Sequence, residues 1–505
     1  MGARFVVRVR VMTLFVIAVV LLLTARLYQL QIMNGEAYAA RADAQFVEPT
    51  TPLLDRGSIF FTNKDGEGVT AATLSNIATS SERQRFYPAG SLAAHTIGFV
   101  AYNNDDVQKG RYGLERYYEQ TLGHAQGDVY SNFFVALFGG IQGVLDGEPQ
   151  KGDLLTTIEP TVEAELERTL QDYMAAWNPD QVGGIIMDPK TGEILGMAIS
   201  PTFDLNAFNK EESVSIFGNP LVESVFEMGS IIKPLTVAAG LDAGVVTAAT
   251  LYNDTGVLEF DGKKISNFDG KARGVIPVQE ILNQSLNLGA AFVAGKLGPD
   301  NMREYFLNRY RLGEESGIDL PGEVHGLMDN LESPRRVEYA TAAFGQGIAM
   351  TPIATARALA SLANGGFLVT PHLVKAVHYD TGVTRELGWG EGVRALKSET
   401  SEEISRMLTE VVDTSLAGGT LKLLHTSVAA KTGTAQIANP GGGGYYEDRF
   451  LHSFFGYFPS YDARFIIFLI AIEPKGAPFA SQTLAPPFHS LTKFLISYYD
   501  VPPDR

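Results

Sequence analysis

The spacing of apolar residues along the chain predicts a mixed domain of helices and strands. Between residues 161 and 177, apolar side chains recur every three to four positions, which is the spacing of one face of an α-helix. Two apolar runs, residues 183–188 and 193–198, flank the turn Pro189-Lys190-Thr191-Gly192 and predict a β-hairpin. Further strands and a final helix are expected at residues 428–437, 450–458, 464–472 and 487–499. Because helical patterns fill most of residues 230–420, this order predicts one sheet whose strands come from distant sequence and whose faces are covered by helices.

The N-terminal stretch combines a basic start with a long apolar run. Residues 1–10 carry three arginines and precede about 20 mostly apolar residues, 11–30, which is enough to cross a bilayer. The positive-inside rule places residues 1–10 in the cytoplasm and the remainder of the chain outside it. The small residues Thr24 and Ala25 leave a cleaved signal peptide as the alternative to an uncleaved anchor. In both cases nearly all of the protein is expected to be extracytoplasmic.

Two further regions follow the apolar run. Residues 31–155 mix turn signals with short predicted elements, among them a turn leading into a strand near Ile59 and a short helix from Gly113. We interpret this region as a small packing module without chemistry of its own. Residues 156–505 form the larger domain, and a chain of 505 residues is expected to fold as two or three domains.

Composition excludes several classes of function. The formal net charge of −17 and the lack of a basic stripe argue against a nucleic-acid-binding protein. The chain has no cysteine, which removes disulfides, thiolate metal sites and cysteine nucleophiles. Its eight histidines show no metal-ligand spacing, so no metal or other cofactor is expected, and His95, His124 and His452 are interpreted as structural.

The first chemical signal is a serine and a lysine three residues apart at the start of a predicted helix. Ser230 and Lys233 share one face of the first turn, and the chain enters this helix through Gly229. The positive end of the helix dipole disfavours a charge on the lysine, and a buried lysine there can act as a base toward the serine. A lone S-x-x-K pattern is weak evidence, and Ser490 and Lys493 repeat it near the C-terminus.

Two later motifs strengthen this interpretation. Ser285 and Asn287 form an S-x-N sequence in a predicted loop, and Lys431-Thr432-Gly433 forms a K-T-G sequence on a predicted strand. The order S-x-x-K, S-x-N, K-T-G, on a helix, a loop and a strand, is the signature of penicillin-binding proteins and serine β-lactamases. A second K-T-G, Lys190-Thr191-Gly192, precedes the serine and lies in a turn, so its order and its context exclude it.

With these motifs the chain resembles the class B penicillin-binding proteins, monofunctional D,D-transpeptidases related to the division and elongation enzymes. The resemblance extends to the N-terminal region, in the stretches that begin at Arg56, Tyr87 and Gly113. It implies an α/β fold of the α+β type: a transpeptidase domain like that of penicillin-binding proteins and serine β-lactamases, with a central antiparallel sheet covered by helices. It also implies that residues 31–155 form a pedestal or dimerisation-like module, whose head is reduced because only about 30 residues separate Arg56 from Tyr87.

The resemblance assigns a role to each motif residue. It implies that Ser230 attacks the carbonyl of a D-Ala-D-Ala bond to form an acyl-enzyme and that Lys233 takes its proton, although the identity of the base is disputed in this superfamily. Lys431 would lower the pKa of Lys233 and attract the terminal carboxylate of the substrate. Ser285 would relay a proton to the leaving amine, and Asn287 would hold Lys233 and the substrate amide.

The later strand residues complete the expected site. The hydroxyls of Thr432 and Thr434, with Gly433 between them, would bind the substrate, and the backbone N–H groups of Ser230 and Thr434 would form the oxyanion hole. The implied substrates are a D-Ala-D-Ala stem peptide of peptidoglycan as donor and a neighbouring stem-peptide amine as acceptor, and the implied inhibitors are β-lactams. The implied partner is a membrane glycosyltransferase of the shape, elongation, division and sporulation class. The implied location is the bacterial cell (inner) membrane, with a single span.

The motifs leave other outcomes of acylation open. With water in place of the acceptor amine, the same residues would serve a D,D-carboxypeptidase or a β-lactamase, and acylation without turnover would suit a β-lactam sensor or scaffold. The predicted anchor and N-terminal module favour transpeptidation, because secreted β-lactamases lack both and sensors carry more membrane segments. The motifs do not distinguish division, elongation and sporulation.

Overall fold

The computed structural model describes the chain in five main stretches. These are residues 55–76, 83–102, 108–123, 151–439 and 444–505, with Met12, Ile17, Val19, Val20, Leu21 and Leu23 described singly. The chain divides into two compact units, residues 1–54 with 76–83 and residues 55–75 with 84–505, and the second contains the candidate site. The predicted tail and anchor, residues 1–30, lie almost entirely outside the described residues, as does His124. Within the described stretches, no helix is both long and apolar enough to span a membrane.

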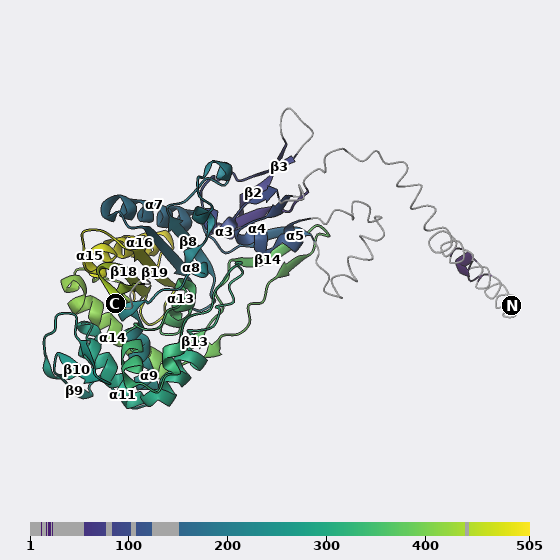
Figure 1. Ribbon diagram of the computed structural model, residues 1–505. Coiled ribbons are helices and arrows are strands. Elements are labelled where there is room, and N and C mark those ends of the chain that lie inside the picture. Colours follow the sequence, from purple (N-terminus) through teal and green to yellow (C-terminus); the bar gives the residue numbers. More distant parts are fainter. Residues whose placement is uncertain are drawn as a thin grey trace, which may run out of the picture. The chain divides into compact units, whose positions relative to one another are not determined.

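A five-stranded sheet forms the centre of the larger domain (Figure 1). Its strand order is β17 (Ala429–Ala438), β18 (Tyr445–Phe458), β19 (Phe465–Ile472), β7 (Gln181–Met187) and β8 (Ile194–Ser200). All neighbouring strands are antiparallel, which confirms the predicted sheet and the predicted β7–β8 hairpin. β18 begins before the predicted residue 450 because its first residues pair with β17 but are mostly exposed, so no apolar pattern marks them.

Two adjacent glycines in β7 show how helices cover both faces of this sheet. Because side chains alternate between faces along a strand, Gly183 and Gly184 point to opposite sides. A Cβ atom on Gly184 would lie 2.8 Å from Leu166, and one on Gly183 would lie 2.9 Å from Leu221, so the absence of side chains permits close packing on both faces. The covering helices are α7 (Pro160–Trp177) with α16 (Ala485–Tyr498) on one face, and α8 (Pro220–Glu223) with α13 (Pro352–Ala360) on the other.

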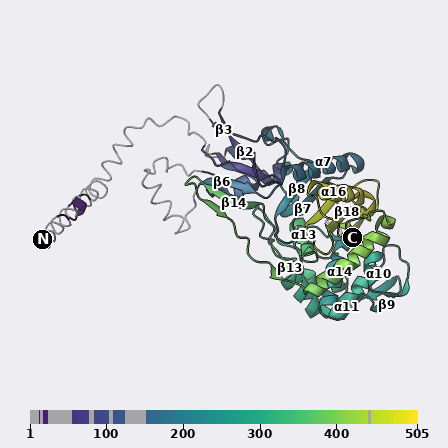
Figure 2. The ribbon, with the colours of Figure 1, turned by 180° about the vertical axis from the view of Figure 1, so that it is seen from behind.

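A second group of helices lies beside the central sheet. It is built from α9 (Lys233–Asp242), α10 (Gln279–Asn283), α11 (Asn287–Arg303), α12 (Arg336–Ala342) and α14 (Ser398–Glu410). One of them, α14, packs on the edge strand β17; Figure 2 labels α10, α11 and α14 of this group. Because α14 and the turn that precedes α9 both pack on β17, the edge of the sheet faces the start of α9. The candidate nucleophile lies in that turn.

The prediction that helices fill most of residues 230–420 is only partly correct. Four short strands, residues 251–277, form a small lobe that we call the β lobe. Its strands are β9 (Leu251–Asp254) paired with β12 (Gly274–Pro277), and β10 (Val257–Phe260) paired with β11 (Lys263–Ser266). Burial in this lobe does not follow hydrophobicity, since Leu251 is exposed and Asp254 is fully buried. The apolar alternation that marks a strand is therefore missing from this part of the sequence.

A six-stranded sheet combines the N-terminal region with later residues. In order it contains β15 (Thr384–Glu386), β14 (Val374–Tyr379), β6 (Gly152–Thr156), β1 (Ile59–Thr62), β2 (Gly68–Asn76) and β3 (Arg83–Phe86). The strand near Ile59 and the short helix α4 (Gly113–Tyr117) match the elements expected there. β6 runs across the expected boundary between residues 155 and 156 and pairs with β14.

Two of the N-terminal stretches that carry the family resemblance meet in a buried ion-pair network. Glu115 is fully buried, and its two carboxylate oxygens accept from Arg56 Nε and Arg85 Nε at 2.6 Å each. Arg56 also reaches Glu119, at 2.7 Å. A buried carboxylate is costly unless it is paired and hydrogen-bonded, so these residue types are required together at this position.

Candidate active site

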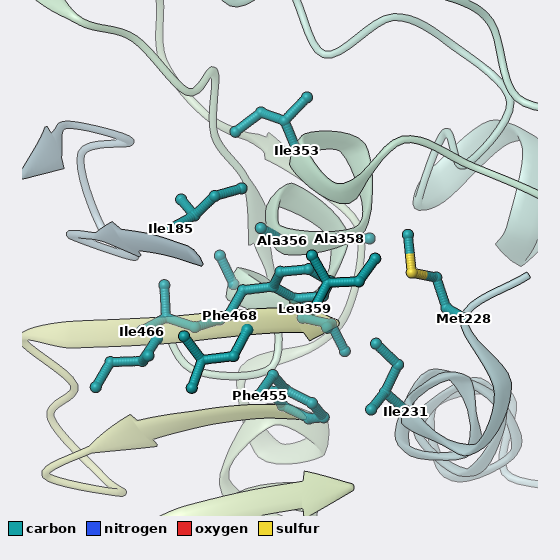
Figure 3. Close-up of a cluster of buried hydrophobic side chains, with 14 of the residues drawn as sticks. Ile185, Met228, Ile231, Ile353, Ala356, Ala358, Leu359, Phe455, Ile466 and Phe468 are labelled. Carbon is teal, nitrogen blue, oxygen red and sulfur yellow. The ribbon is translucent and has the colours of Figure 1, made fainter. Parts of the chain in front are cut away.

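Ser230 lies on a short 3₁₀ turn, Gly229–Ile232, that leads directly into α9. Its neighbours Met228 and Ile231 are fully buried, and Figure 3 shows both side chains at the edge of the hydrophobic cluster that contains Phe455. The Ser230 side chain remains partly exposed. The apolar neighbours therefore anchor the turn in the core while the hydroxyl stays accessible.

Three contacts hold this turn in place. Gly229 has φ +64° and donates its N–H to Gly345 O at 3.1 Å. A Cβ atom at Gly229 would lie only 2.9 Å from Thr434 O, so a glycine permits the close approach of turn and strand. Ser453 of β18 adds a third contact, since its hydroxyl donates to Met228 O at 2.9 Å. Ser453 was not predicted, because a lone serine in an apolar strand carries no motif.

Lys233 points back along the turn toward the serine. The lysine is fully buried, and its Nζ lies 2.9 Å from Ser230 Oγ. The same Nζ lies 2.6 Å from Ser285 O and 3.2 Å from Ser285 Oγ. The three positions available around a lysine nitrogen are therefore directed at Ser230 and Ser285.

Ser285 joins the first lysine to the second. Its Oγ lies 3.0 Å from Lys431 Nζ, which also donates to Thr432 O at 2.9 Å. Ser285 lies between α10 and α11 with φ +56°, a conformation that costs energy for a residue with a side chain. The structure thus connects Ser230, Lys233, Ser285 and Lys431 in one chain of contacts.

Burial sets the charges of the two lysines. Burial lowers the pKa of Lys233 well below its ordinary value, and the nearby charge of Lys431 lowers it further. Burial also lowers the pKa of Lys431, to about 7. A neutral Lys233 nitrogen has a lone pair that can accept the hydroxyl proton of Ser230, which is what an activated serine requires.

The two faces of β17 separate two kinds of side chain. Lys431 and Gly433 are buried toward the nucleophile turn, whereas Thr432 and Thr434 are partly exposed. A Cβ atom at Gly433 would lie 2.7 Å from Met228 O, so the glycine of K-T-G allows the strand to pass next to the turn. The Thr434 hydroxyl accepts from Ala480 N at 3.1 Å and retains its own proton for donation.

Gly433→Ala is expected to lower the free energy of unfolding by about 1–3 kcal/mol, because the new methyl group overpacks the contact with Met228 O. Urea unfolding measures this change. Gly295→Ala is the matched control: a Cβ atom there meets nothing within 4 Å, and the position lies inside α11. Alanine should stabilise that helix by about 0.5–1 kcal/mol. Equal effects of the two substitutions would contradict the close approach at Gly433.

The Asn287 side chain does not make the expected contact with Lys233 among the described residues. Its side-chain amide donates to Ser266 O in the β lobe, at 2.9 Å. No hydrogen bond joins Asn287 to Lys233 in the described part of the chain, where Ser230 and Ser285 take up the contacts of the lysine nitrogen. Asn287 thus holds the β lobe at the site in this structure.

The repeated motifs lie away from this constellation. Ser490 and Lys493 are both exposed on α16. Lys190 lies in the β7–β8 turn, is half exposed and pairs with Asp462. Neither copy is bonded to a second lysine or serine among the residues described, so geometry supports the choice made from motif order.

The family model for the penicillin-binding protein transpeptidase domain matches residues 182–492. The chain belongs to this family. The match contains all three motifs and confirms the resemblance to class B penicillin-binding proteins.

Stage V sporulation protein D of Bacillus subtilis is 31% identical over 433 residues, which cover 84% of this chain and 65% of that protein. The probable peptidoglycan D,D-transpeptidase FtsI of Caulobacter vibrioides is 29% identical over 412 residues, covering 80% of this chain and 63% of that protein. The chain thus spans slightly less than two thirds of the length of these relatives.

A solved structure resembles the whole described fold. The crystal structure of penicillin binding protein 3 from Mycobacterium tuberculosis superposes with a TM-score of 0.78 at 26% identity, covering 90% of this chain and 98% of that one. The same protein has been crystallised in complex with ampicillin and with aztreonam. The mixed α/β transpeptidase fold predicted from the motifs is therefore confirmed.

Proposed function

We propose that the protein is a peptidoglycan D,D-transpeptidase that cross-links stem peptides through an acyl-enzyme on Ser230. The observation that carries the proposal is the contact chain from Ser230 through Lys233 and Ser285 to Lys431. A relative named as a probable peptidoglycan D,D-transpeptidase supports the substrate class. The complexes of the Mycobacterium tuberculosis protein with ampicillin and aztreonam support acylation by β-lactams.

In the first half of the reaction, Ser230 Oγ attacks the carbonyl carbon of the D-Ala-D-Ala peptide bond and gives its proton to neutral Lys233. The C–N bond then breaks, and Ser285 gives its proton to the leaving nitrogen and takes the proton held by Lys233, which becomes neutral again. D-Ala leaves and an ester to Ser230 remains. Backbone N–H groups of Ser230 and Thr434 are proposed to stabilise the oxyanion, because the turn and the strand that carry them lie in contact.

In the second half, an amine of a neighbouring stem peptide attacks the ester and gives a proton to neutral Lys233. The C–O bond to Ser230 breaks, and Ser230 Oγ takes that proton from Lys233 as the cross-link forms. Lys431, Thr432, Gly433 and Thr434 are proposed to hold the terminal carboxylate of the donor. Thr432 and Thr434 are partly exposed on β17, and Lys431 supplies positive charge from behind the strand. Asn287 is proposed to contact the substrate amide from the edge of the β lobe.

We further propose the organisation expected from the sequence: a cytoplasmic tail of residues 1–10, a membrane anchor of residues 11–30, an N-terminal module of residues 31–155 and a transpeptidase domain of residues 156–505. The basic and apolar pattern of residues 1–30 supports the anchor. This arrangement would hold the catalytic domain outside the cell membrane, beside a membrane glycosyltransferase of the shape, elongation, division and sporulation class.

The fate of the acyl group tests this function. The purified protein is incubated with a donor peptide ending in D-Ala-D-Ala, with and without an amine acceptor, and products are followed by mass spectrometry. We expect D-Ala release with acceptor incorporated into the product. Hydrolysed donor alone would indicate a carboxypeptidase. In a parallel incubation with penicillin, rapid loss of the bound penicillin would indicate a β-lactamase, and a stable penicilloyl adduct without peptide turnover would indicate a sensor.

A further inference from the structure

The β lobe forms hydrogen bonds to the residues before and after Ser285. On the side after Ser285, Leu288 N donates to Asn267 Oδ1 at 3.2 Å, and Asn287 Nδ2 donates to Ser266 O at 2.9 Å. On the side before it, Arg273 Nε donates to Gln284 Oε1 at 3.1 Å. The lobe therefore contacts residues 284, 287 and 288, immediately around a serine that holds both lysines.

Asn267 and Arg273, which make the contacts on the two sides of Ser285, both bond to Asp254 in β9. Its carboxylate is fully buried and accepts from Asn267 Nδ2, with distances of 3.0 and 2.9 Å to the two oxygens. It also accepts from Gly256 N at 2.8 Å. Its backbone carbonyl accepts from Arg273 N at 3.2 Å. Asp254 thus fixes the rotamer of Asn267, so that the carbonyl oxygen of that amide faces Leu288 N.

These contacts are needed because Ser285 adopts a left-handed backbone conformation, with φ +56°. A residue with a side chain holds such a conformation only when its surroundings enforce it. That conformation directs Ser285 O to Lys233, at 2.6 Å, while Ser285 Oγ contacts Lys431. Relaxing the loop would withdraw both oxygens from the lysines.

We propose that Asp254, acting through Asn267, is a positioning residue that holds the Ser285 loop in the conformation that the reaction uses. This inference rests on the proposed function. Asp254 does not contact Ser230, Lys233 or Lys431 in the described structure, so its effect passes through the loop. The β lobe is accordingly a scaffold of the active site.

An exchange of the two side chains tests this contact directly. Asp254→Asn sets two amide groups against each other, and Asn267→Asp sets two buried carboxylates side by side. The double variant Asp254→Asn with Asn267→Asp restores one donor and one acceptor in reversed order. We expect each single variant to slow acylation by a fluorescent penicillin about 10²-fold, because small misplacements of reacting groups are this costly. The double variant should regain most of the rate.

Asp319→Asn is the matched control. Asp319 is also fully buried and accepts from Leu373 N at 2.7 Å, from Val374 N at 2.9 Å and from the Tyr118 hydroxyl at 2.9 Å. These contacts lie outside the Ser285 loop. The control should lower the melting temperature but leave the acylation rate constant and its pH profile as in the wild type.

The pH profile of acylation separates positioning from general stability. When Ser285 moves away and Lys233 becomes less enclosed, the pKa of Lys233 rises toward its ordinary value, so the profile of Asp254→Asn should move to higher pH. A lowered melting temperature with an unchanged rate constant and pH profile would overturn the inference. If Asp254→Asn does not fold, Asn267→Ser provides the second test, because it keeps Asp254 but withdraws the amide oxygen that accepts from Leu288 N. Its rate should fall in the same direction, and an unchanged rate would overturn the inference.

Failure of the folded wild type to be labelled would overturn the proposed function as well, whereas normal labelling in every variant would overturn only the role of Asp254.

Discussion

Replacing Ser230 with alanine is expected to abolish covalent labelling by a fluorescent penicillin. Ser230 is the partly exposed hydroxyl within 2.9 Å of a buried lysine nitrogen, and no ester can form at this position once its oxygen is removed. Peptide cross-linking should fall by at least about 10⁴-fold, as in other serine acyl-transfer sites that lose the nucleophile. Denaturing gel electrophoresis after labelling measures the first loss, and mass spectrometry of the cross-linked peptide product measures the second.

Ser490→Ala is the matched control for that experiment, because Ser490 begins the second S-x-x-K sequence of the chain. Ser490 and Lys493 are exposed on α16, and neither is bonded to a second lysine among the described residues. We expect Ser490→Ala to be labelled at the wild-type rate. Labelling that persists in Ser230→Ala and disappears in Ser490→Ala would reverse the assignment of the nucleophile.

The strands of the central sheet could be predicted because their burial follows their hydrophobicity. β19 and the inner half of β18 are buried over nearly their full length and consist largely of apolar residues. The β lobe could not be predicted in the same way. Its buried centre is Asp254 and its exposed positions include Leu251, so its fold depends on hydrogen bonds between residues that no local pattern relates.

The active site likewise combines residues that the sequence predicts with contacts that it does not. The order of the motifs and their placement on a helix, a loop and a strand were sufficient to select Ser230, Lys233, Ser285 and Lys431, which the structure brings together. The contact of Asn287 with Ser266 could not be inferred, because it joins a side chain to a backbone carbonyl 21 residues away. The left-handed conformation of Ser285 was equally hidden, since that conformation favours glycine and is enforced here by tertiary contacts.

Lys233→Met is expected to slow acylation by about 10²–10⁴-fold, the usual contribution of a positioned general base. Methionine has a similar length and suits a fully buried position, so the substitution removes the basic nitrogen without opening a large cavity. Stopped-flow measurement of the second-order rate constant for penicillin acylation, with urea unfolding to verify the fold, gives the result. A rate within about threefold of the wild type would exclude Lys233 as the base that activates Ser230.

The pH dependence of the wild-type rate follows from the two lysines. Lys233 must be neutral to accept a proton, so the rate should rise as pH increases through its lowered pKa. Lys431 must be charged to attract a carboxylate, so the rate should fall again above its pKa of about 7. The second-order rate constant should therefore pass through a maximum, and its two limbs belong to the coupled pair of lysines.

Lys431→Met distinguishes the origins of the two limbs. Without the charge of Lys431, protonated Lys233 is less disfavoured, so the pKa of Lys233 rises and the ascending limb moves to higher pH. The descending limb should disappear, because no second lysine remains to lose its charge, and the maximal rate should be lower. A descending limb that persists in Lys431→Met would mean that another group binds the carboxylate. An ascending limb that stays in place would mean that burial alone, without the neighbouring charge, sets the basicity of Lys233.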